Sequence, residues 1–212
     1  MKKMLVSMIC TLFMISASVF PIFADTNNDN VINEEHFNGV IKISDPETNQ
    51  TWEWEIAKED VNIMTLQSTV SGDEQMKISS VSVNAGKYLA ETMGKKSGYS
   101  GREDDIILRT GLVYSADSVK NTVRIYNVFG STYQKGQYYP TNRCVYWRNP
   151  GAGIGGKFFP TSNSWNYSVD SSPGFYETST LIFPYSLLDC DVRISGMSSK
   201  RTVSVMYNLN DL

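Results

Sequence analysis

Apolar and polar residues alternate with a period of two along most of the chain beyond residue 38. The alternation is clear in five segments, which are 51–56, 122–126, 164–169, 189–194 and 202–209. Successive side chains of a β-strand point to opposite faces of its sheet, so this period predicts strands with one buried and one solvated face.

Residues that favour turns separate these segments. Proline, glycine, asparagine and serine cluster at residues 45–50, 149–151, 172–174 and 195–196. The first cluster joins 41–44 to 51–56, which predicts a hairpin. Further strands are predicted at 77–83, 106–114, 143–148, 157–159 and 176–183. About nine or ten short strands predict an all-β fold, an antiparallel β-sandwich with a barrel as the alternative.

One short helix is predicted over residues 85–93. Asn84 has the side chain of an N-cap, and Gly94 is a residue at which helices commonly end. The stretch 88–92 also fits a strand, so both readings stay open here.

The first 24 residues have the pattern of a signal peptide. Lys2 and Lys3 precede an uncharged apolar run, 4–23, and Ala24 is the small residue that the peptidase requires before the cut. A membrane anchor is the alternative, but the run is short and contains Pro21. We therefore expect cleavage after Ala24, secretion, and no membrane span in the mature chain.

The mature chain is predicted to have three parts. Residues 25–38 form a polar extension, 39–67 a β-hairpin region, and 76–212 the main sandwich. The polar stretch 67–75 is either a boundary between two domains or a long surface loop of one domain.

The charge of the mature chain excludes some partners. Without the leader, 188 of the 212 residues remain, with 17 basic and 22 acidic side chains. An acidic chain lacks the basic surface with which proteins bind nucleic acid or an anionic membrane. We expect neither as a partner.

Two cysteines, Cys144 and Cys190, remain once the leader and its Cys10 are removed. Outside the cell, two cysteines most simply form one disulfide. Their spacing is not that of a zinc site, because no CxxC pair and no nearby histidine accompanies them. We predict a Cys144–Cys190 bond.

The glycine-rich stretch 151–157 matches two nucleotide-binding patterns in its letters alone. A P-loop requires Ser or Thr after the lysine, but Phe158 follows Lys157. Both patterns also require a helix next, whereas 157–160 reads as a strand that stops at a proline. A flexible hairpin loop is predicted, and no cofactor is expected.

The acidic stretch that follows the leader contains four oxygen ligands with the spacing of a calcium loop, namely Asp25, Asn27, Asp29 and Asn33. This run resembles the first half of a dockerin repeat, which implies a calcium-bound module that binds a partner. His36 stands where the loop needs a bidentate carboxylate, and no second copy follows. We favour a solvated tail without metal.

Composition also excludes most hydrolytic chemistry. His36 is the only histidine and precedes the predicted fold, so a Ser-His-Asp or Cys-His mechanism has no base. Paired carboxylates hydrolyse glycosides without histidine, and Glu103, Asp104, Asp105 and Glu177 are the candidates. We regard this run as a solvated turn and expect no catalytic residues.

Aromatic residues are concentrated in one part of the chain. Between residues 126 and 185, 15 of the 60 residues are Phe, Tyr or Trp. Exposed rings stack on sugars and anchor protein interfaces. Neighbouring residues of a strand face opposite ways, so rings in adjacent positions cannot all be buried. We predict a ligand-binding surface formed by Tyr138, Tyr139, Tyr146 and Trp147.

The overall layout resembles a group of uncharacterised, secreted, β-rich proteins from Gram-positive bacteria. The similarity covers the leader, the polar spacer, the hairpin that ends in Thr-Trp-Glu-Trp, the segment 121–133 and the closing strand 202–205. It implies location and fold class only.

We predict a non-catalytic extracellular module that binds a glycan or a protein. The alternatives are a glycoside-active enzyme, a passive envelope protein, and a small secreted toxin or inhibitor. The oligomeric state stays open.

Overall fold

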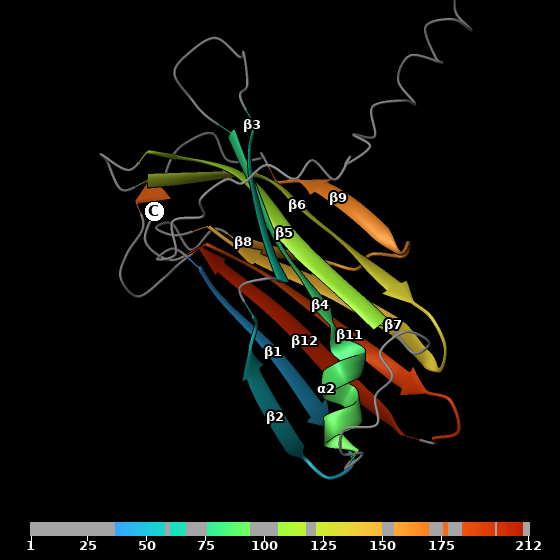
Figure 1. Ribbon diagram of the computed structural model, residues 1–212. Helices are drawn as coiled ribbons and strands as arrows, with labels where there is room; N and C mark the ends of the chain where they lie inside the picture. Colours follow the sequence, from blue (N-terminus) through green and yellow to red (C-terminus); the bar gives the residue numbers. More distant parts are fainter. Residues whose placement is uncertain are drawn as a thin grey trace, which may run out of the picture. The chain divides into compact units, whose positions relative to one another are not determined.

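The structure is a computed structural model that describes residues 37–57, 60–66, 76–93, 106–117, 122–149, 155–169, 176–177, 184–197 and 199–209. Within these ranges the chain forms twelve β-strands and one helix, and the paired strands run antiparallel (Figure 1). The predicted all-β fold is confirmed.

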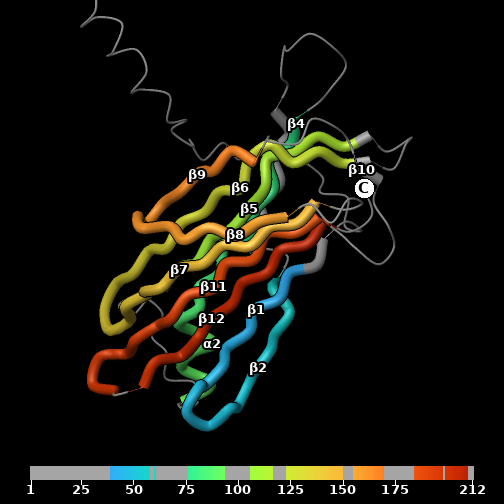
Figure 2. Tube along the Cα trace, turned by 180° about the vertical axis from the view of Figure 1, so that it is seen from behind, coloured from blue at the N-terminus to red at the C-terminus, as the bar shows by residue number. Residues whose placement is uncertain are grey.

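The first sheet joins the two ends of the described chain. Its strand order is β2 (Gln50–Glu55), β1 (Phe37–Asp45), β12 (Lys200–Leu209), β11 (Tyr185–Ile194), β7 (Tyr138–Arg148) and β8 (Gly155–Phe158). β1 pairs with β12 from Phe37 opposite Leu209 to Ser44 opposite Thr202. The predicted hairpin β1–β2 is therefore part of this sheet (Figure 2).

The second sheet is built around β5 and β6. Its order is β10 (Tyr176–Glu177), β6 (Thr122–Gln134), β5 (Ile106–Asp117), β4 (Met76–Asn84) and β3 (Val61–Leu66), and β9 (Ser164–Ser168) also pairs with β6. β3 was not predicted from the sequence. The predicted strand 176–183 corresponds in its first two residues to β10, and 178–183 lie outside the described residues.

The inner faces of the two sheets supply the core. Burial alternates residue by residue along β11 and β12, as the period of two predicts. The core cluster contains buried residues of both sheets, such as Leu108 and Val128 of the second and Leu188 and Val203 of the first. Both sheets are open at their edges, so the predicted sandwich is confirmed and the barrel alternative is not.

A buried hydrogen bond also links the sheets. The hydroxyls of Thr110 on β5 and Ser186 on β11 are bonded to each other, and both residues are fully buried. Removing one hydroxyl leaves the other without this partner in an apolar core. We expect Ser186→Ala to lower the free energy of unfolding by about 1–3 kcal/mol.

The double variant Ser186→Ala with Thr110→Val tests this explanation, because it removes both hydroxyls and keeps the shape of the threonine. Urea unfolding should show the double variant to be less destabilised than the sum of the single variants. Additive losses would contradict a direct bond between the two groups.

The predicted helix forms as α2 (Ala85–Thr92). The Asn84 side chain accepts a hydrogen bond from the Gly86 N–H at 3.1 Å, and Met93 is the C-cap. Gly94, the predicted stop, lies outside the described residues. Tyr88 and Leu89 are buried in the sandwich core, and the Tyr88 ring lies 5.1 Å from that of Trp54 on β2.

Three glycines lie beneath aromatic rings of the neighbouring strand. Gly111 pairs with Phe129, Gly130 with Trp165 and Gly156 with Trp147. A Cβ on Gly111 would lie 2.6 Å from Phe129 Cζ, and a Cβ on Gly130 would lie 2.5 Å from Trp165 Cζ2. Some rings of the aromatic-rich region therefore pack on the backbone of glycines in neighbouring strands. The second half of the predicted glycine loop is strand β8.

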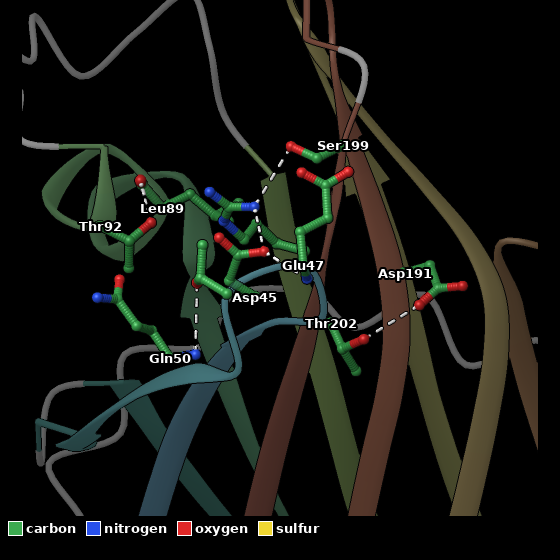
Figure 3. Close-up of polar contacts among 10 residues, drawn as sticks. Asp45, Glu47, Gln50, Leu89, Thr92, Asp191, Ser199 and Thr202 are labelled. Carbon is green, nitrogen blue, oxygen red and sulfur yellow. Dashed lines mark hydrogen bonds and ion pairs between the residues drawn. The ribbon is translucent and has the colours of Figure 1, made fainter.

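A bulge between β7 and β11 is fixed by Asp191. The register shifts between Asp189 and Asp191, and Asn142 adopts a positive φ of 49°. The Asp191 carboxylate accepts a hydrogen bond from Thr202 Oγ1 at 3.2 Å (Figure 3). It also accepts hydrogen bonds from Asn142 Nδ2 at 2.8 Å and from Lys200 Nζ.

These contacts predict a loss of stability in acid. Burial raises the pKa of Asp191, but its hydrogen bonds and the Lys200 charge outweigh burial and hold the pKa below the ordinary 3.8. The stabilisation is therefore complete above the pKa of the unfolded carboxyl and is lost as the pH falls through the folded pKa. Urea unfolding down to a pH of about 3 should show a weaker acid loss for Asp191→Asn than for the wild type. Equal losses would contradict this role.

Candidate functional site

The outer face of the first sheet carries a row of four apolar side chains, one from each of four adjacent strands. The strand register aligns Tyr146 with Leu187, Leu187 with Met206, and Met206 with Val40. All four are half-buried and point away from the core, and we call them the apolar row. Figure 2 views the sheet from this side, and none of the described helices and strands covers it.

Opposite charges stand at the two ends of the apolar row. Lys157 on β8 pairs with Tyr146, and Glu55 on β2 pairs with Val40. Both charged residues are exposed. The full row across the six strands therefore begins with a cation, passes through four apolar residues, and ends with an anion.

The next row on this face is polar. In register it contains Cys144, Asp189, Ser204, Lys42 and Glu53. Burial raises the pKa of the Asp189 carboxyl, and a hydrogen bond with Ser204 opposes the shift. The pKa of Tyr146 is also raised, chiefly by its hydrogen bond with Cys144. A raised pKa makes a phenol a poorer nucleophile at neutral pH.

The predicted disulfide is absent, and both cysteines are buried free thiols. Cys144 lies on the outer face beside Asp189, whereas Cys190 lies in the core in line with Leu188 and Val192. Strand alternation thus places the two sulfurs on opposite faces of one sheet. Burial raises the pKa of Cys190 to about 12, which leaves it unreactive near neutral pH.

The structure separates the four aromatic residues predicted to bind a ligand together. Tyr138 is only 1% exposed and donates a hydrogen bond to the Gly86 carbonyl at 3.4 Å, so its predicted binding role is corrected to a core role. Trp147 packs against the core over Gly156. Tyr139 and Tyr146 do share the outer face, but Tyr139 lies beside Arg193, far along β7 from the apolar row.

Two other aromatic residues connect the edges of the sheets. The rings of Phe158 on β8 and Tyr167 on β9 lie 3.8 Å apart, centroid to centroid. Phe158 packs against the core, and the next residue, Phe159, is exposed with Lys157 Nζ 5.9 Å from its ring centroid. This pair therefore links the sheets, and it does not supply a flat platform of free rings.

An open cavity of about 450 Å³ lies at the C-terminal end of α2. Its lining residues are Thr92, Met93, Gln137, Ile194, Ser195, Met197 and Arg201. The Arg201 guanidinium is buried, and its Nη1 lies 3.0 Å from Asp45 Oδ1 and donates to Ser199 Oγ at 3.4 Å. Figure 3 shows this group of contacts. Because Asp45 neutralises Arg201, none of the described lining residues offers a free charge with which to select a ligand.

Asp45 also organises the hairpin turn beside this cavity. Its Oδ1 accepts a hydrogen bond from the Glu47 N–H at 3.0 Å, and Asn49 takes the positive φ of 56° that the turn requires. Desolvation raises the pKa of Asp45, but the backbone bond from Glu47, a bond with Thr48 and the Arg201 charge lower it overall. The Asp45–Arg201 ion pair therefore has a structural role, because it holds the hairpin turn in place.

Several residues that the sequence offered as calcium ligands or catalytic carboxylates cannot be placed in the site. The calcium candidates Asp25, Asn27, Asp29 and Asn33 lie outside the described residues, as do Glu103, Asp104 and Asp105 and the side chain of Glu177. Among the described residues, no three His, Cys, Asp or Glu side chains gather as a metal site would require. No helix in the described ranges has the length and apolar character needed to cross a membrane.

No protein-family model matches the chain, and comparisons with curated proteins and with solved structures find no match either. The function must therefore be inferred from the residues and their geometry.

Proposed function

We propose that this protein is a non-catalytic extracellular module that binds a protein surface through the outer face of its first sheet. The observation that carries the proposal is the apolar row. The exposed face of an antiparallel sheet is normally polar, and an apolar strip rimmed by polar residues is typical of an interaction site.

The chemistry of the row favours a protein over a glycan. Sugar binding relies on exposed flat rings that stack on the pyranose face. The row contains one tyrosine and three aliphatic or thioether side chains, Val40, Leu187 and Met206, at half-buried positions. Such side chains gain free energy by excluding water against another apolar surface, which is how the centre of a protein interface is built.

The surroundings of the row also fit a protein partner. Polar and charged residues on both sides of it, such as Ser204 and Asn208 on β12 and Lys42 on β1, correspond to the polar rim of an interface. The leader 1–24 supports an extracellular location, because it combines two lysines, an apolar run and a small residue at the cleavage position.

Binding to two arrays tests this function, one of extracellular proteins that includes this protein itself and one of glycans. We expect retention on the protein array that Leu187→Asp weakens by at least about 100-fold, since this change places a charge at the centre of the face. Lys87→Glu, an exposed charge change on α2, is the control and should bind like the wild type.

Retention on the glycan array that Tyr139→Ala abolishes and Leu187→Asp leaves unchanged would contradict the proposal. Urea unfolding of each variant shows whether a loss of binding reflects a loss of fold.

A further inference from the structure

We infer that the protein bound by the apolar row is a second copy of this chain, in a two-fold dimer with the first sheets face to face. This inference rests on the proposed function, since it names the partner of the same face. It follows from the order of residues across the sheet, which is Lys157, Tyr146, Leu187, Met206, Val40 and Glu55.

A two-fold axis that lies between the sheets, parallel to the strands and between β11 and β12, reverses this order in the second copy. Lys157 then faces Glu55 of the second copy, and Leu187 faces Met206 of the second copy. By symmetry each of these contacts occurs twice. The row is therefore complementary to itself in charge as well as in apolar character.

The neighbouring polar row fits the same operation. Asp189 on β11 comes to lie opposite Ser204 of the second copy, and Lys42 on β1 opposite Cys144 of the second copy. No two like charges of these rows face each other, whereas Arg193, one row beyond Asp191, would face Lys200 of the second copy, so the contact ends before that row.

The size of the face suits a weak dimer. Six strands at about 4.8 Å spacing span roughly 24 Å from β2 to β8, and the four rows from Tyr185 to Asp191 on β11 span about 20 Å along the central strands. The resulting area of at most about 500 Å² per copy is smaller than the roughly 800 Å² that each partner contributes to a standard interface, and it is in the range of reversible association. Sheets packed face to face keep their strands within about 30° of each other, as this axis requires.

Exchanging the terminal charges tests the arrangement. Lys157→Glu and Glu55→Lys, each alone, place like charges opposite each other twice per dimer and should weaken self-association about tenfold in sedimentation equilibrium. An equimolar mixture of the two variants should recover it, because in the mixed dimer every contact again joins opposite charges. Both residues are exposed, so folding is not at risk.

The outcomes separate this inference from the proposed function. A wild-type protein that stays monomeric, yet is retained by other proteins on the array through Leu187, would overturn the dimer and leave the function intact. Dimers that neither single charge change weakens, or that the mixture does not recover, would overturn the arrangement as well. Lys87→Glu should dimerise like the wild type.

Discussion

Replacing Trp165 with alanine should lower the free energy of unfolding by about 3–5 kcal/mol. Trp165 is 8% exposed, belongs to the core cluster and covers Gly130 on the neighbouring strand β6. Removing the ring both exposes apolar surface and leaves a void above that glycine. Equilibrium urea unfolding of the variant and the wild type measures the loss.

The contribution of the ring can be separated from that of the indole N–H. Trp165 Nε1 is buried and has no acceptor among the described residues, so Trp165→Phe removes an unsatisfied donor and keeps most of the packing. We expect Trp165→Phe to retain much more stability than Trp165→Ala. Equal losses would show that ring packing does not hold this edge.

The glycine beneath the ring gives an independent check. A Cβ at Gly130 would lie 2.3 Å from the Arg109 carbonyl oxygen and 2.5 Å from Trp165 Cζ2. Gly130→Ala should therefore cost about 1–3 kcal/mol by overpacking. In the Trp165→Ala background the cost should fall without vanishing, since the Arg109 contact remains. An unchanged cost would contradict the cross-strand contact.

The second large effect is expected for Leu188→Ala, which should lower the free energy of unfolding by about 2–5 kcal/mol. Leu188 is fully buried among the inner residues of both sheets. Its neighbour Leu187 is a matched control, because it lies on the same strand and points to the outer face. Leu187→Ala should cost far less stability and should weaken self-association.

This pair of variants tests whether the inner face of β11 stabilises the fold and the outer face binds the second copy. Urea unfolding should show the large loss of stability in Leu188→Ala. Sedimentation should show the loss of self-association in Leu187→Ala. A large loss of stability in Leu187→Ala with full association would indicate that the outer face is covered by the fold itself.

The alternation of residues was sufficient to predict the class of fold. The segments 189–194 and 202–209 correspond to β11 and β12, and their inner and outer residues are those that the period of two predicts. The helix α2 was also predictable, because Asn84 caps it through the mechanism that its side chain suggested. β3 was missed, although its residues 61–66 contain valine, isoleucine and threonine.

The candidate site could be predicted only in part. Met206 occupies an outward position of the predicted strand 202–209, so this anomaly is visible in the sequence, whereas Val40 and Leu187 precede the predicted strands 41–44 and 189–194. What joins them is the pairing of β1 with β12 across most of the chain length, which no local pattern specifies. Tyr146 was identified because it is aromatic, but its partners were not.

The disulfide prediction failed for the same kind of reason. Counting cysteines tells how many are available, but the register of β7 and β11 decides which face each one occupies. The aromatic prediction treated Tyr138 and Trp147 as exposed because they lie in a dense run of rings. Trp147 instead covers Gly156, a cross-strand relation that requires the sheet pairing.

Oxidation of methionine tests most directly whether the outer face of the first sheet binds a second copy. Met206 lies in the apolar row, whereas Met197 is 38% exposed and lies outside it, so one protein carries both the probe and its control. Brief hydroxyl-radical exposure followed by mass spectrometry gives both rates. The dimer predicts that raising the protein concentration slows Met206 oxidation several-fold and leaves Met197 unchanged. A constant ratio of the two rates across concentration would contradict it.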